Sequence, residues 1–275
     1  MKYMIPKGSV QETLLISLCG RKMAMDLYPD LFSDRDCQAL LEKIDFEAPK
    51  MSGIKAKIGA IMAATRQFDM AEGCRQYLKN HPNAAVVNLG CGLDTTFYQV
   101  DNGTANGYNL DFPDVIRVRS ELLPPREREY NIACNLNDHS WFHSVDFKPE
   151  DGAVFFASGV FYYFKTEDVR KLFSAMAEHF PGGKLIFDAT NAKGLKNMLK
   201  TWLKPAEMEN VGLYFSVEEE KELLPWSDRF VSVTRKGYMT GYRPLDRRYG
   251  ILANTIFRFG DKSGMCQVLE LEFRS

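Results

Sequence analysis

Two short stretches of the sequence carry residues that could hold a nucleotide. In AAVVNLGCGLDTTFYQV, residues 84–100, an apolar segment ends in a turn with Gly90 and Gly92. The second stretch, YNLDFPDV at 108–115, contains Asp111, which lies about twenty residues after the turn. Small residues at such a turn let backbone N–H groups approach a ligand, and the later carboxylate can accept hydrogen bonds from ribose hydroxyls. The pattern predicts a cofactor that contains adenosine.

The glycine turn lacks one feature of a dinucleotide site. That fingerprint uses a third glycine to allow close packing of the following helix against the strand. Thr95 stands where this glycine belongs, which counts against NAD. A nicotinamide-dependent oxidoreductase and a purely structural turn remain alternatives at this point.

The elements that must position these residues fall into two parts. Residues 1–80 show helical periodicity and no convincing strand, which predicts an N-terminal helical cap. Residues 81–275 are the expected cofactor-binding domain, and their first part alternates apolar strands with helices, as parallel sheets do. We expect strands at 85–89, 106–111, 129–134, 153–157 and 184–188.

The last part of the chain departs from this alternation. Residues 191–226 predict a helical insertion, and β-branched and aromatic residues then predict strands at 230–238, 255–259 and 267–273. The last two would form a hairpin across 260–264. The predicted fold class is therefore α/β, with a doubly wound, mostly parallel sheet and an antiparallel C-terminal edge.

Charge, cysteine content and hydropathy argue against several classes of protein. Lys and Arg (35) nearly balance Asp and Glu (36), so no overall charge favours nucleic acid. The six cysteines form no CxxC pair and have no histidine at a metal-ligand spacing, so we expect no metal site. The apolar segment at 14–18 is too short to span a membrane. These features predict a cytoplasmic protein with no membrane or nucleic-acid partner.

Four blocks of sequence support a more specific assignment. They read VVNLGCGLDTTFYQ, YNLDFPDVIRVRSELLP, CNLNDHSWF and FFASGVFYYFKTEDVRKLF. In order and spacing they resemble the leucine carboxyl methyltransferase family, and within it the branch of polyketide-synthesis O-methyltransferases. The resemblance covers essentially the whole chain. It implies a class I methyltransferase (Rossmann-like) fold, S-adenosylmethionine as cofactor, and methyl transfer to oxygen, often a carboxylate oxygen.

This cofactor presents a ribose, an adenine and a methionine group, and each needs a different partner. Asp111, followed by Phe112, is the expected acceptor for the ribose hydroxyls; a cap on the helix that begins near Pro113 is its alternative role. The turn at 90–92, including Cys91, would lie beneath the methionine group. Asp94 follows the turn and either contacts the cofactor or only caps the next helix.

The family pattern adds two further groups of cofactor contacts. Arg66, in AATRQFDMA, falls where the family places an arginine, and a guanidinium matches the methionine carboxylate bidentately. A surface role for this arginine is the alternative. After the third strand the family supplies an acid and an apolar residue to adenine. Here the corresponding residues are Asn135, Leu136 and Asn137, which would bind the base without a charge or form an ordinary turn.

A second departure from the family pattern lies after the fourth strand. The family commonly has acid-Gly-Val there, whereas this chain has Ser158-Gly159-Val160, so a charge that could hold the methionine ammonium is absent. An aromatic run follows at 161–164. We assign Tyr162 to the cofactor site, because an aromatic face stabilises a cation, and the other members of the run to the core.

The expected substrate is a small aromatic or polyketide-like carboxylic acid, with a phenol as the alternative. A carboxyl group with a pKa near 4 is already ionised at neutral pH, whereas a phenol with a pKa near 10 would need a base. The four histidines form no recognisable dyad, so we expect no catalytic base. Because Asn135 and Ser158 replace acids, a non-catalytic binding protein is a further alternative.

One basic helix face is open to two interpretations. Lys193, Lys196, Lys200 and Lys204 repeat at helical spacing opposite an apolar stripe. The face is either solvated or part of a lid that attracts an anionic substrate.

Overall fold

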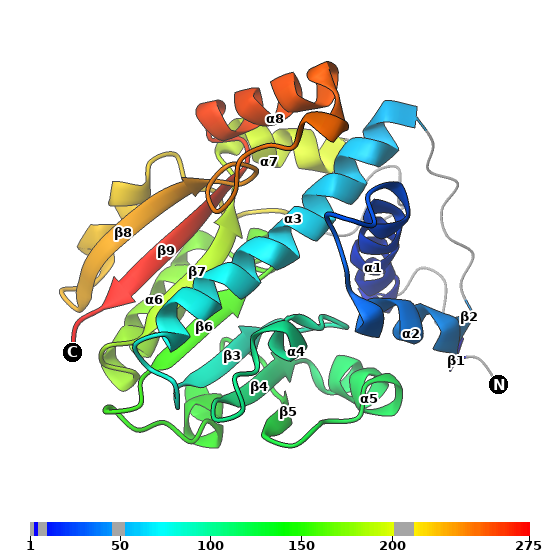
Figure 1. Cartoon of the computed structure of the whole chain (residues 1–275). Coiled ribbons are helices and arrows are strands. Elements are labelled where there is room, and N and C mark those ends of the chain that lie inside the picture. Colours follow the sequence, from blue (N-terminus) through cyan, green and yellow to red (C-terminus); the bar gives the residue numbers. More distant parts are fainter. Residues whose placement is uncertain (1–2, 5–9, 46–52, 201–211) are drawn as a thin grey trace.

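The structure, a computed structural model, describes residues 3–4, 10–45, 53–200 and 212–275. Its centre is a seven-stranded sheet in the order β5-β4-β3-β6-β7-β9-β8 (Figure 1). The strands are β3 (Ala85–Leu89), β4 (Asn106–Asp111), β5 (Glu129–Ala133), β6 (Ala153–Ala157), β7 (Lys184–Ala189), β8 (Phe230–Gly237) and β9 (Gln267–Phe273). β3 to β7 pair in parallel, and β9 pairs antiparallel with both β7 and β8. The predicted α/β class and antiparallel edge are confirmed.

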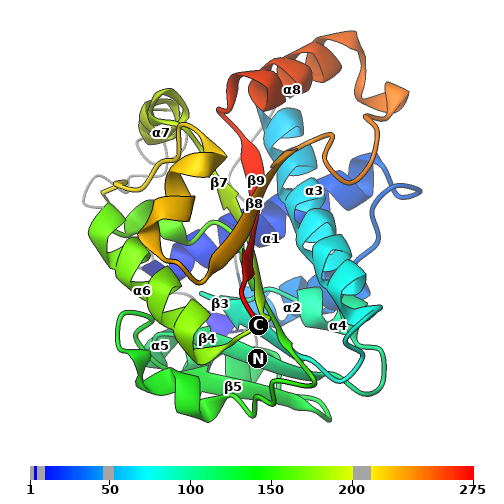
Figure 2. The ribbon, with the colours of Figure 1, turned by 90° about the vertical axis from the view of Figure 1, so that its left-hand side faces the viewer.

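Helices cover both faces of this sheet. α3 (Gly53–Leu78), α4 (Thr96–Val100) and α5 (Pro113–Leu122) share one hydrophobic core with one face. α6 (Thr166–His179) and the 3-10 helix η1 (His139–Ser144) pack on the other face (Figure 2). β3 pairs with β4 on one side and with β6 on the other, so strands are added first on one side of β3 and then on the other. In open α/β sheets such a switch point is where ligands bind, at the carboxyl ends of the strands.

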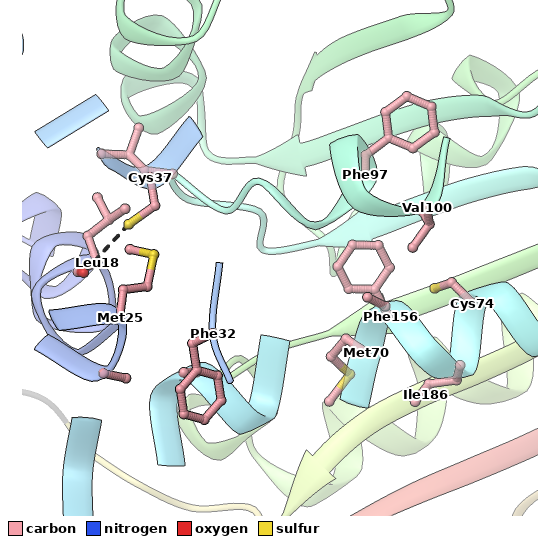
Figure 3. Close-up of a cluster of buried hydrophobic side chains, with 14 of the residues drawn as sticks. Leu18, Met25, Phe32, Cys37, Met70, Cys74, Phe97, Val100, Phe156 and Ile186 are labelled. Carbon is pink, nitrogen blue, oxygen red and sulfur yellow. Dashed lines mark hydrogen bonds between the residues drawn. The ribbon is translucent and has the colours of Figure 1, made fainter. Parts of the chain in front are cut away.

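The N-terminal helices belong to the same core as the sheet. α1 (Val10–Leu27) and α2 (Arg35–Lys43) contribute Leu18 and Cys37, and these pack in one cluster with Met70 of α3 and Phe156 of β6 (Figure 3). A two-residue parallel pair, β1 (Tyr3–Met4) with β2 (Ile44–Asp45), lies in the segment where no strand was expected. Within the described part of the chain, no helix is long and apolar enough to cross a membrane.

The strand predicted at 255–259 is wrong. These residues lie in α8 (Ile251–Ser263), and the hairpin predicted across 260–264 is instead the end of this helix, where Gly264 adopts a left-handed conformation. Thr255-Ile256-Phe257-Arg258-Phe259 is rich in β-branched and aromatic residues like a strand, but the buried positions of the helix are Ala253, Asn254 and Phe257, which lie on one helical face. Burial of this one face overrides local β propensity.

The predicted insertion at 191–226 begins and ends in short helices. α7 (Ala192–Met198) follows β7, and the 3-10 helix η4 (Glu220–Trp226) precedes β8. Lys193, Lys196 and Lys200 are exposed, while Lys204 lies outside the described residues.

Asp69 of α3 is a buried acid with an unusual pKa. Its side chain is 1% exposed, and its Oδ2 has no hydrogen-bond partner. Burial raises its pKa from 3.8 to about 8, with Asp261 adding to the rise and Arg243 and Lys236 opposing it. The folded state therefore binds the Asp69 proton more tightly than the unfolded state does. The free energy of unfolding falls as pH rises from 3.8 to about 8, because the unfolded state then loses this proton and the folded state keeps it.

We therefore expect Asp69→Asn to change how stability depends on pH. Between pH 5 and 7 the wild type should lose up to about 2.7 kcal/mol relative to the variant, at about 1.36 kcal/mol per unit. Urea unfolding at both pH values measures this difference. Asp26→Asn, at an exposed position of α1, is the control. Parallel pH dependences for wild type and Asp69→Asn would contradict the argument.

Candidate functional site

The turn after β3 is shaped by its two glycines. Gly90 and Gly92 have φ of 65° and 48°, values that side chains disfavour. A Cβ at Gly90 would lie 2.6 Å from Cγ2 of Val160, so the turns after β3 and β6 pack directly together. Cys91 between the glycines is buried, which raises its thiol pKa and makes it a packing residue. The turn is thus held at the switch point of the sheet.

Asp111 at the end of β4 faces this turn. Its Oδ2 accepts a hydrogen bond from the N–H of Gly92 at 2.8 Å, and its Oδ1 accepts one from the N–H of Phe112 at 2.8 Å. Burial raises its pKa, while these two N–H groups lower it. Phe112, half exposed, occupies the N-cap position of α5. The structure therefore brings Gly92, Asp111 and Phe112 together.

A buried arginine, Arg119, holds the turn after β3 through its carbonyl groups, and it was not among the predicted residues. Nη1 of Arg119 in α5 donates to the carbonyl oxygens of Gly92 at 3.1 Å and Asp94 at 2.7 Å. Its Nη2 lies 3.3 Å from Oε1 of Glu129, and neither side chain is more than 1% exposed. The guanidinium therefore fixes the direction in which the turn's carbonyl groups point.

A second buried arginine holds the turn from the N-terminal helices. Nη1 of Arg21 in α1 donates to Oγ1 of Thr95 at 3.0 Å and to Asp34 at 3.1 Å. Nε2 of Gln67 in α3 also donates to Oγ1 of Thr95, at 3.0 Å. The residue that replaces the third glycine is thus an anchor for α1 and α3. Oδ1 of Asp94 accepts a hydrogen bond from the N–H of Thr96 at 2.8 Å, and Asp94 lies one position before Thr95, the N-cap residue of α4.

The residues after β5 form a turn at the same edge of the sheet. Oδ1 of Asn135 accepts a hydrogen bond from the N–H of Asn137 at 3.0 Å, and both residues are exposed. Leu136 between them is buried, and its carbonyl oxygen accepts a hydrogen bond from Nε1 of Trp141 at 3.2 Å. The side-chain oxygen of Asn135 therefore stabilises the turn. An ordinary turn was the alternative to an adenine contact that the sequence left open.

The remaining predicted residues meet at a buried carboxylate, Asp188 at the end of β7. Its Oδ2 accepts hydrogen bonds from Nη1 of Arg66 and Oη of Tyr162, each at 3.1 Å, and its Oδ1 accepts one from the N–H of Gly159 at 2.6 Å. Ser158 is half-buried beside this cluster. Sequence analysis missed Asp188, although the acid at the end of an apolar strand was a usable signal.

Gly159 allows the close approach of Arg66. Its φ is 75°, and a Cβ at this position would lie 2.8 Å from Nη1 of Arg66. The glycine thus makes room for the guanidinium.

Comparison with known proteins identifies the family. The sequence profile of leucine carboxyl methyltransferases matches residues 19–177, more than half of the chain. The chain belongs to the leucine carboxyl methyltransferase family. This result confirms the resemblance carried by the four sequence blocks, and it makes methyl transfer the chemistry to be explained.

One curated relative is similar in sequence. The tetracenomycin polyketide synthesis O-methyltransferase TcmP of Streptomyces glaucescens is 29% identical over 182 residues, which are 66% of this chain and 66% of that protein. The match thus spans slightly less than two thirds of the relative's length.

Solved structures of low sequence identity share the fold. A protein from Thermobifida fusca YX, provisionally assigned as a methyltransferase, has a TM-score of 0.62 at 15% identity and covers 98% of this chain and 96% of its own. The plantazolicin methyltransferase BpumL in complex with SAH has a TM-score of 0.51 at 12% identity, covering 98% of this chain and 100% of its own. A geranyl diphosphate methyltransferase in complex with SAM has a TM-score of 0.50 at 14% identity, covering 86% and 94%. These likenesses show that the chain shares the fold of these proteins.

Proposed function

We propose that this protein is an S-adenosylmethionine-dependent O-methyltransferase that methylates the carboxylate of a small aromatic acid. The contact between Asp111 and the N–H of Gly92 carries the proposal. The proposed ribose acceptor thus lies against the glycine turn, at the switch point of the sheet, in a protein that belongs to a methyltransferase family.

The adenosine end of the cofactor fits this corner of the sheet. Each oxygen of Asp111 accepts one backbone N–H, and a carboxylate has about four lone-pair sites. Acceptor capacity therefore remains for two ribose hydroxyls. The ring of Phe112, 50% exposed, offers an aromatic face next to them.

The methionine end fits Arg66. Its side chain is 19% exposed, whereas that of its partner Asp188 is 1% exposed, so the guanidinium lies between the buried acid and the surface. A guanidinium has five N–H donors in a fixed plane; one contacts Asp188, and Nη2 contacts Oγ of Ser17 at 3.5 Å. The others include donors suited to a carboxylate.

Exposed aromatic rings in the segments next to Tyr162 favour an aromatic acceptor. Tyr163 is 40% exposed and Tyr214 is 55% exposed. The N–H of Tyr214 donates to the carbonyl oxygen of Tyr162 at 2.7 Å, which ties the two segments together. Faces of this kind can stack on an aromatic acid and stabilise a cation by about 0.5–2 kcal/mol.

The chemistry asks little of the protein beyond alignment. Bound S-adenosylmethionine supplies an electrophilic methyl group. An acceptor carboxylate is already ionised at neutral pH, so the chain has only to bind it, orient one oxygen and exclude water. This is why the proposal needs no catalytic base.

Methylation of a panel of aromatic acids and phenols tests the proposal. The protein is incubated with methyl-labelled S-adenosylmethionine, and each labelled product is treated with mild base. A base-labile methyl group supports a carboxylate ester, whereas a base-stable one supports the phenol alternative. Binding of the cofactor without transfer to any acceptor favours a non-catalytic binding protein. Binding of NADH instead of S-adenosylmethionine overturns the cofactor assignment.

Gly159→Ala should weaken cofactor binding about tenfold. A methyl group at this position meets Nη1 of Arg66, and it also carries the strain of a positive φ, about 1–2 kcal/mol. Isothermal calorimetry with S-adenosylhomocysteine measures the affinity. Gly103→Ala is a matched control, because Gly103 has φ 88° and no atom within 4 Å of a Cβ. Equal affinities for the two variants would show that the Arg66 contact is unimportant.

A further inference from the structure

We propose that Asp188 is a positioning residue, which orients the guanidinium of Arg66 toward the carboxylate of the cofactor's methionine group. The inference rests on the proposed function, because it assumes that Arg66 binds this group. It adds a residue that acts through another and makes no contact with the cofactor.

Three donors from two separate segments converge on Asp188. Arg66 comes from α3, while the N–H of Gly159 and the hydroxyl of Tyr162 come from the segment after β6. Ala157 of β6 pairs with Phe187 of β7, so Asp188 lies directly beside the start of that segment. One carboxylate therefore fixes Arg66 of α3 relative to the turn after β6.

Burial separates the roles of the two charged residues. Asp188 is 2% exposed as a residue, and its two oxygens already accept three hydrogen bonds. The side chain of Arg66 is more exposed than that of Asp188, and its guanidinium packs against Gly159. Asp188 is therefore placed to hold Arg66 from behind, and Arg66 is placed to meet a ligand.

A neutral amide cannot reproduce this arrangement. Both carboxylate oxygens face donors, with the N–H of Gly159 on one and Arg66 with Tyr162 on the other. In Asp188→Asn, the amide NH₂ group must face one of these donors in either orientation. One side of the cluster is then lost, and the guanidinium loses its fixed direction.

Two probes that differ only at the methionine end test this role. S-adenosylhomocysteine carries the amino-acid carboxylate, and 5′-methylthioadenosine lacks the amino-acid group. Asp188→Asn should weaken S-adenosylhomocysteine binding about tenfold, the effect of losing a hydrogen bond to a charged group. Binding of 5′-methylthioadenosine should change less than about twofold. Isothermal calorimetry gives both affinities, with no need for an acceptor.

Further variants separate positioning from general destabilisation. In an Arg66→Gln background, Asp188→Asn should cost no further affinity for S-adenosylhomocysteine, because its effect passes through Arg66. Asp188→Glu keeps a charged two-oxygen acceptor and should restore part of the loss, and it replaces Asp188→Asn if that variant does not fold. Glu270→Gln is the matched control. Glu270 is also a buried acid with three donors, namely Lys184, Lys236 and Tyr242, but it lies on β9.

The outcomes are distinct for the inference and for the proposed function. Equal loss of both probes in Asp188→Asn, or tighter binding of S-adenosylhomocysteine, overturns the positioning role. The same selective weakening of S-adenosylhomocysteine binding in Glu270→Gln overturns it as well. If the wild type binds neither probe, the proposed function itself fails.

Discussion

Asp111→Asn is expected to lower the affinity for S-adenosylhomocysteine and for 5′-methylthioadenosine about 100-fold each. The amide NH₂ group would face either the N–H of Gly92 or the N–H of Phe112, since each carboxylate oxygen accepts one of them. It would also remove acceptor sites for the ribose hydroxyls. Two hydrogen bonds to a charged group, at about 1.5 kcal/mol each, correspond to roughly this factor.

Because the defect lies at the adenosine end, both probes should weaken together. This pattern differs from the selective loss expected for Asp188→Asn. Asp114→Asn, at an exposed position on the first turn of α5, changes the same charge nearby and is the control. Calorimetric affinities within about threefold of the wild type for Asp111→Asn would refute the ribose role.

Arg119→Met is expected to lower the free energy of unfolding by about 3–5 kcal/mol, the usual cost of leaving one partner of a buried ion pair alone. Glu129 would remain in the core without its guanidinium partner. The carbonyl groups of Gly92 and Asp94 would lose a shared donor as well. Cofactor affinity should therefore fall together with stability.

Urea unfolding measures the first effect, and calorimetry below the transition measures the second. Arg117→Met, at an exposed position on the same helix, should change neither by much. Adding Glu129→Gln to Arg119→Met removes the stranded charge and should recover part of the stability but little of the affinity. Recovery of both together would mean that Arg119 has no role in shaping the turn.

Local patterns predicted most of the fold because the central strands are buried on both faces. β6 is a continuous apolar run, and β3 is apolar apart from Asn88; both lie between turn residues, and their ends were placed correctly. α8 was wrong because its exposed face carries Ile251, Leu252 and Phe259, so apolar residues surround much of the helix and conceal its period. Gly250 and Gly264, which bound it, were the available signal.

The candidate site was predictable where its residues lie close together in the sequence. Gly92 and Asp111 are 19 positions apart and belong to one strand-turn-helix-strand pattern. Asp188 is 122 positions from Arg66; an acid at the end of an apolar strand marks a candidate residue, but the sequence does not show that its partner is Arg66. Arg119 was hidden in the same way, because only tertiary structure shows which helix arginine points inward.

The hydrogen bond from Arg21 to Thr95 joins residues 74 positions apart and lies in the interior. During synthesis, α1 leaves the ribosome long before Thr95 does, so its buried guanidinium has no complete set of partners until the turn after β3 has emerged. The N-terminal helices therefore cannot finish folding by themselves. They reach their final packing only when the first part of the sheet forms against them, and the two regions are expected to open and close as one cooperative unit.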